Sequence, residues 1–76
     1  MTTLTADKQL RAGRRLHSEG KQKEARRSLE EAIGIYRSKI ASGLAIFRAR
    51  LAESLEVLSD VEADEGNVEA ARVHLS

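Results

Sequence analysis

The amino-acid sequence predicts an all-α fold of two antiparallel helical hairpins, four helices in total. Apolar residues recur every three or four positions between residues 25 and 40, which places them on one face of an α-helix. The chain has no proline, so its breaks are expected at glycines, namely at Gly20, at Ser42-Gly43 and at Gly66. No stretch alternates apolar and polar residues for long, and β-branched and aromatic residues are sparse, which argues against strands.

The first hairpin is predicted to span about residues 6–41 and to turn at Gly20. Its first helix is expected to begin near Thr5, whose hydroxyl can cap free backbone N–H groups, and to end near Ser18. Its second helix should begin just after Gly20 and end near Ala41. The residues of this second helix that are predicted to face the core are Ala25, Leu29, Ala32, Ile33, Tyr36 and Ile40.

The second hairpin is predicted to span about residues 43–76 and to turn at Gly66. Its first helix should extend from about Gly43 to Asp64. The apolar residues of this helix, spaced by three or four, are Leu44, Phe47, Leu51, Leu55 and Leu58. A fourth helix, capped by Asn67, is expected to bury only Val68, Ala71 and Leu75, which makes it too short to cover the third helix.

The size and composition of the chain limit what it can be. Seventy-six residues make one domain at most, and a core of this size is marginal when alone, so we expect support from a partner or from oligomerisation. The chain has no cysteine, and its two histidines are far apart in sequence, so the sequence predicts no disulfide, no metal site and no cofactor. No window approaches about 20 apolar residues, so we expect no membrane span and a cytoplasmic location.

The charge of the chain is divided between its two parts, although its formal net charge is only +1. Residues 1–50 hold twelve basic and five acidic residues, a net charge of +7. Residues 51–76 hold one basic and seven acidic residues, a net charge of −6. The two parts either attract each other within one monomer or join the basic part of one copy to the acidic part of another.

Part of the first hairpin returns near the C-terminus. When Gly20 is laid on Gly66, an offset of 46 residues, Ala25 aligns with Ala71 and Leu29 with Leu75. A glycine at the turn, an alanine five residues later and a large apolar residue four further on are typical of a closely packed helical hairpin.

This pattern resembles the tetratricopeptide repeat family. The matching residues are Gly13, Leu16, Gly20, Ala25, Leu29 and Ala32 in the first copy, and Leu58, Ser59, Gly66, Ala71 and Leu75 in the second. The usual period is 34 residues, and the excess of about twelve here is expected to lengthen the second and third helices, so the resemblance is to long-helix variants. The sequence departs from the family pattern in two other ways: Gln9 and Leu55 replace the aromatic residue that opens each repeat, and the closing proline is absent. An unrelated four-helix bundle with alanine-rich seams is the alternative.

The resemblance implies that the first helix of each hairpin lines a concave groove. The predicted partner-binding residues in this groove are Arg14, His17, Glu53, Glu56, Asp60 and Asp64. The four carboxylates follow one another at steps of three, four and four, so they form one acidic stripe on a helix. Such a stripe could bind a basic peptide or helix, and the alternative is that it is simply a solvated face.

The function predicted from these features is a non-catalytic module for protein–protein interaction or self-assembly, which binds a peptide, a helix or a second copy. About three repeats are usually needed for stability and only two are predicted, so we expect completion by dimerisation. A closed homodimer with Phe47 and Leu51 at its axis is favoured. Neither histidine has a partner in a recognisable acid–base motif, so we expect no enzyme.

The alternative function is a small helical nucleic-acid-binding domain that uses the basic first hairpin. Lys8, Arg11 and Arg15 form a basic stripe on the first helix, and a basic second helix could enter a major groove. The nearly balanced charge disfavours this alternative, as does the presence of only Tyr36 and Phe47 for base stacking.

Overall fold

The computed structural model describes the backbone of residues 2–75 and the side chains of residues 2–66. Over this range the chain forms the helices α1 (Thr3–Ser18), α2 (Gln22–Ala41) and α3 (Arg48–Leu75), with a single 3-10 turn, η1 (Ala45–Phe47), before α3. None of the described residues is in a strand, so the all-α prediction is confirmed.

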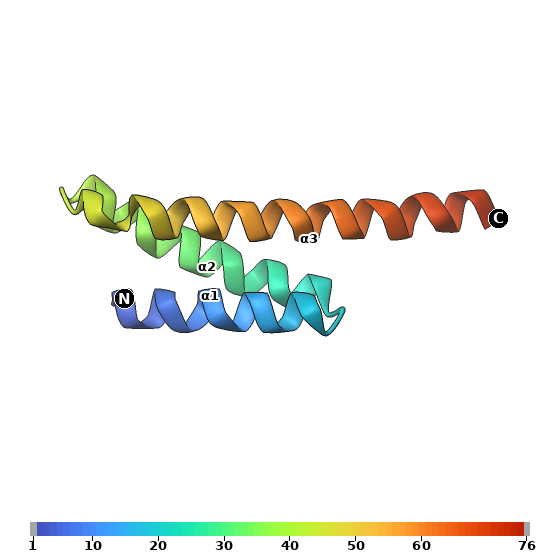
Figure 1. Ribbon diagram of the computed structural model, residues 1–76, viewed down its shortest axis with the longest axis horizontal. Coiled ribbons are helices and arrows are strands. Elements are labelled where there is room, and N and C mark those ends of the chain that lie inside the picture. Colours follow the sequence, from blue (N-terminus) through green and yellow to red (C-terminus); the bar gives the residue numbers. More distant parts are fainter. Residues whose placement is uncertain (1, 76) are drawn as a thin grey trace.

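The helices are arranged with α2 in the middle. It packs against both α1 and α3, whereas α1 and α3 touch each other much less. Figure 1 shows that α1 and α3 run in the same direction and that α2 runs back between them. The last part of α3 extends beyond the turn that joins α1 to α2 (Figure 1), and the molecule is elongated, with extents of 50 × 18 × 15 Å.

The prediction of four helices is wrong, because α3 continues through Gly66 to Leu75. The predicted hairpin of residues 43–76 is therefore one long helix, which begins at Arg48 rather than at Gly43. A glycine inside a helix costs about 1 kcal/mol relative to alanine, but it does not end the helix by itself. The predicted packing of Val68, Ala71 and Leu75 concerns side chains outside the described residues.

The other two predicted glycine turns are confirmed. Gly20 and Gly43 have φ angles of 80° and 98°, which glycine adopts without a steric penalty. After α1, the N–H of Lys21 donates to the carbonyl of Leu16 at 2.9 Å, and the N–H of Gly20 donates to that of His17 at 3.1 Å. This pair of bonds is the Schellman motif. The same pair recurs at Gly43, so α1 and α2 both end with this motif.

The helix α1 begins earlier than predicted. Thr2, not Thr5, is its N-cap, because the hydroxyl of Thr2 accepts a hydrogen bond from the N–H of Thr5 at 3.3 Å. Thr5 therefore lies in the first turn, where it supplies the capped N–H group instead of the capping oxygen.

The seam between α1 and α2 is closely packed, as the sequence predicted. Ala25, Leu29 and Ala32 of α2 are fully buried. Gly13 of α1 lies against Leu29, and a Cβ atom added at Gly13 would lie only 2.6 Å from the Leu29 side chain. A side chain at position 13 would therefore push the two helices apart.

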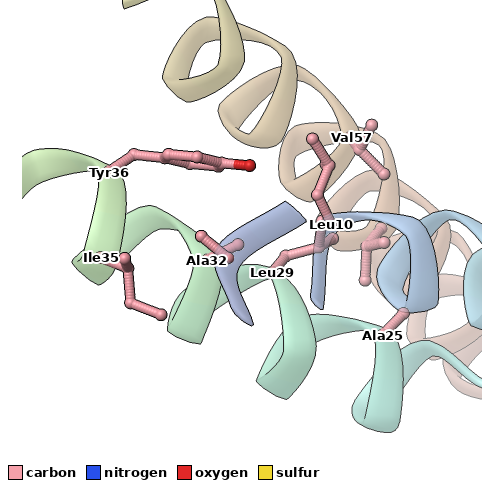
Figure 2. Packing of buried hydrophobic residues seen from close by; sticks show 9 residues of the cluster. Leu10, Ala25, Leu29, Ala32, Ile35, Tyr36 and Val57 are labelled. Carbon is pink, nitrogen blue, oxygen red and sulfur yellow. The ribbon is translucent and has the colours of Figure 1, made fainter. Parts of the chain in front are cut away.

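The buried face of α3 is rotated from the one predicted. Ser54, Val57 and Val61 are buried, whereas Leu55 is 39% exposed and Leu44, before η1, is 44% exposed. Figure 2 shows Val57 of α3 near Leu10 of α1 and Leu29 of α2, in the core that the three helices share. The hydroxyl of Ser54 donates to the carbonyl of Arg50 at 2.8 Å, so this serine is buried without an unpaired polar group.

Candidate functional site

The predicted groove residues of α1 and α3 lie opposite each other and pair within the chain. Arg14 forms an ion pair with Glu53. Nδ1 of His17 lies 3.7 Å from Oδ2 of Asp64, and 2.8 Å from Oε1 of Gln22. The Arg14 side chain is 55% exposed, so water screens its pair, which contributes at most about 1 kcal/mol to stability. Four of the six predicted partner-binding residues thus connect α1 to α3.

The other two residues of the acidic stripe face solvent. Glu56 and Asp60 are exposed, and neither forms an ion pair with another described residue. The stripe is therefore divided lengthwise, with one edge against α1 and the other edge free for a partner. Binding of a basic peptide at Glu56 and Asp60 stays a prediction.

A polar cluster, which no sequence pattern indicated, joins α1, α2 and α3 near the N-terminus of α1, with Tyr36 buried and Arg50 half-exposed. The Tyr36 hydroxyl donates a hydrogen bond to Oδ1 of Asp7, and Nη1 of Arg50 lies 3.3 Å from the same oxygen. Tyr36 is fully buried, so its hydroxyl needs this partner. The three residues are far apart in sequence and belong to no motif, so only the packing of the helices brings them together.

Burial, together with the hydrogen bond to Asp7 and the charge of Asp7, raises the pKa of Tyr36 from 10.0 to about 12. The folded state therefore keeps the phenol protonated at pH values where the unfolded chain ionises. The stabilisation from this shift is fully present below pH 10 and is lost as the pH rises from 10 to about 12.

We therefore expect the thermal midpoint of the wild type to fall between pH 10 and pH 12, and that of Tyr36→Phe to fall less. All other side chains are the same in both proteins, so the difference between the two melting profiles isolates the phenol. Parallel profiles over this range would contradict the assigned role of Tyr36.

The residues predicted at a dimer axis are partly used inside the chain. Phe47 stacks on Tyr36, with ring centroids 6.1 Å apart and an angle of 23° between the ring planes. Phe47 and Leu51 are both half-buried and pack against the core. A dimer axis at these two residues stays a prediction, but Phe47 has its main contacts within its own chain.

A further apolar surface lies on α3, on the side away from the acidic stripe. Leu51, Leu55 and Leu58 follow one another at steps of four and three, so they share one side of the helix, and we call them the leucine flank. Leu51 and Leu58 are half-buried against the core, whereas Leu55 is exposed. The leucine flank thus continues the core outward to solvent.

No group of three or more histidine and acidic side chains is placed to hold a metal ion within residues 2–66, whose side chains the structure describes. A hollow on the outer side of α2, at Gly34, is lined by residues of that helix alone, so its walls do not enclose a small molecule. None of the described helices is both long enough and apolar enough to cross a membrane.

Comparisons of the chain with protein-family models, with curated proteins and with solved structures found no match.

Proposed function

We propose that this chain is a non-catalytic helical interaction module that self-assembles through the leucine flank of α3. The observation that carries this proposal is that the flank is continuous with the core yet open to solvent at Leu55. Helix faces of this kind are usually covered by another helix. In this proposal α1 and α2 make one hairpin like that of a tetratricopeptide repeat, and α3 begins the next, which a second copy completes.

The accessible surface area of the chain further supports association. The accessible surface is 5298 Å², whereas a compact monomer of 8.4 kDa is expected to expose about 4,600 Å². The chain therefore exposes more surface than its mass requires. The opposite charges of the two parts are already used in part within one copy, by Arg14 with Glu53 and by Arg26 with Glu65 at 2.8 Å. This leaves the leucine flank, rather than the charge division, as the main force for assembly.

Sedimentation equilibrium over a concentration series tests this proposal. The wild type is expected to shift from 8.4 kDa towards twice that mass as its concentration rises. Leu55→Lys should stay monomeric, because it places a charge on the flank. Leu4→Lys is the matched control, since Leu4 is 77% exposed on α1, and it should associate like the wild type.

A monomeric mass at every concentration would contradict the proposal, especially together with cooperative unfolding at a midpoint that does not depend on concentration.

Nucleic-acid binding is the second candidate, and its support is the basic stripe of α1. Lys8, Arg11 and Arg15 are exposed, and none of them pairs with a described acidic residue. Binding through phosphates releases counterions, so it would weaken steeply as salt rises. Association through leucines would not weaken in this way, so adding duplex DNA to the same sedimentation series at two salt concentrations separates the two functions.

A further inference from the structure

We infer that the second copy binds antiparallel, α3 against α3, with Leu55 near the two-fold axis, in place of the axis at Phe47 and Leu51 that the sequence predicted. This inference rests on the proposed self-assembly and adds the geometry of the pair. The leucine flank continues in both directions at the same helical spacing, to Arg48 on the N-terminal side and to Glu62 on the C-terminal side. Leu55 lies midway between these two charged residues.

The positions of Arg48 and Glu62 decide the direction of the second helix. Each lies seven residues, or about two helical turns, from Leu55, so both lie on the side of the helix that carries Leu55. In an antiparallel pair, Arg48 of one copy lies opposite Glu62 of the other, and the two-fold symmetry makes this contact twice. A parallel pair would set Arg48 against Arg48 and Glu62 against Glu62, which repel.

Both charged residues are available for this contact. Arg48 and Glu62 are exposed, and neither forms an ion pair within the described part of the chain. By contrast, the carboxylates on the opposite edge of α3 include Glu53, which Arg14 already holds. Arg48 and Glu62, which border the leucine flank, are thus free to pair with Glu62 and Arg48 of a second copy.

The dimensions of α3 also allow an antiparallel pair. The segment from Arg48 to Glu62 is about 21 Å long at 1.5 Å per residue, and packed helices lie about 8–10 Å apart. The hairpin of α1 and α2 packs against the neighbouring face of α3, which carries Ser54, Val57 and Val61, and leaves Leu55 exposed, so a second α3 can reach the flank without displacing the core.

This inference is tested by reversing the charge at each of the two positions and then mixing the two single variants. Arg48→Glu and Glu62→Arg should each weaken self-association by at least about tenfold, because each sets like charges opposite each other twice. An equimolar mixture of the two single variants should restore association, since every contact then joins opposite charges. The double variant Arg48→Glu/Glu62→Arg should likewise associate as the wild type does.

The matched control is Arg11→Glu, which reverses an exposed charge on the outer side of α1 and should leave association unchanged. Circular dichroism confirms that each variant keeps its helical content.

The outcomes distinguish this inference from the proposed function. A monomeric wild type overturns self-assembly itself. If the wild type dimerises but the mixture of single variants stays monomeric, the antiparallel geometry is wrong and self-assembly stands. If each single variant dimerises like the wild type, the copies are parallel or meet at another surface, and the inference fails.

Discussion

Replacing Tyr36 with alanine is expected to lower the free energy of unfolding by about 3–5 kcal/mol, which is the largest loss that we expect from a single substitution in this chain. Tyr36 is the largest fully buried side chain among the described residues. The variant loses the stack on Phe47 and leaves Asp7 without the hydroxyl that donates to it. A 76-residue chain is expected to have about 4–11 kcal/mol of stability in total, so urea titration should show a protein close to unfolded.

Tyr36→Phe is the control for the alanine variant. It keeps the ring and its packing but removes the hydroxyl, so we expect a smaller loss of about 1–3 kcal/mol, from the lost hydrogen bond to the Asp7 carboxylate. If the alanine variant loses less than the phenylalanine variant, the ring is not the central core element that we describe.

Leu29→Ala is expected to cost about 2–5 kcal/mol, because it leaves a cavity in the seam between α1 and α2. Leu29 is fully buried, and it fills the space that Gly13 leaves open on α1. Thermal or urea unfolding measures the loss. Leu4→Ala serves as the control, since Leu4 is largely exposed and its truncation should change stability by no more than about 0.5 kcal/mol.

The contact between Gly13 and Leu29 allows a second test of the packing between α1 and α2. Gly13→Ala alone should destabilise the protein, because the added methyl group would meet the Leu29 side chain. In the Leu29→Ala background the same methyl group has room. The double variant should therefore be more stable than the sum of the two single losses predicts, and simple additivity would contradict the close approach of the two helices.

The α1–α2 hairpin could be predicted from sequence because local signals and tertiary packing agree there. The small residues Ala25 and Ala32 on the apolar face of α2 indicated a close helix, and Gly13 is the position that this helix approaches. Gly20 ends α1 with a positive φ angle, as its position between two helical patterns indicated. In this hairpin the residues that form each helix are also the ones that pack.

Gly66 is the position at which the local sequence signals mislead. It resembles Gly20 in its local sequence, but it stays within α3 while Gly20 and Gly43 turn the chain. Whether a glycine ends a helix depends on whether the following segment gains more by packing back than by continuing the helix. That difference involves the whole fold and is not visible in the local pattern.

The buried face of α3 was predicted wrongly for a similar reason. The leucines at positions 51, 55 and 58 look like a core stripe because they are large and apolar. Ser54, Val57 and Val61 form an equally regular stripe, but a serine lowers its apparent hydrophobicity. Since the hydroxyl of Ser54 bonds within its own helix, the smaller stripe enters the core and the leucines are left at its edge.

The charged residues of the groove could be placed on α1 and α3 from sequence, but their partners could not. Arg14 and Glu53 were each expected to meet an external partner, yet they pair with each other. Their pairing depends on how far apart α1 and α3 lie, and these two helices are separated in the sequence by α2. The pattern of one helix gives the side on which a charge lies, whereas the placement of the helices determines what it meets.

The most direct test of an antiparallel α3 pair is the distance between nitroxide labels on two copies. The chain has no cysteine, so Ala63→Cys and Gly66→Cys each give one labelling site, and an added Cβ at Gly66 meets nothing within 4 Å. With Leu55 at the axis, the two labelled backbone positions should lie about 26 Å apart for residue 63 and about 34 Å apart for residue 66. Equal distances of about 10 Å at both sites, which a parallel pair would give, or no dipolar coupling between copies, would contradict the account.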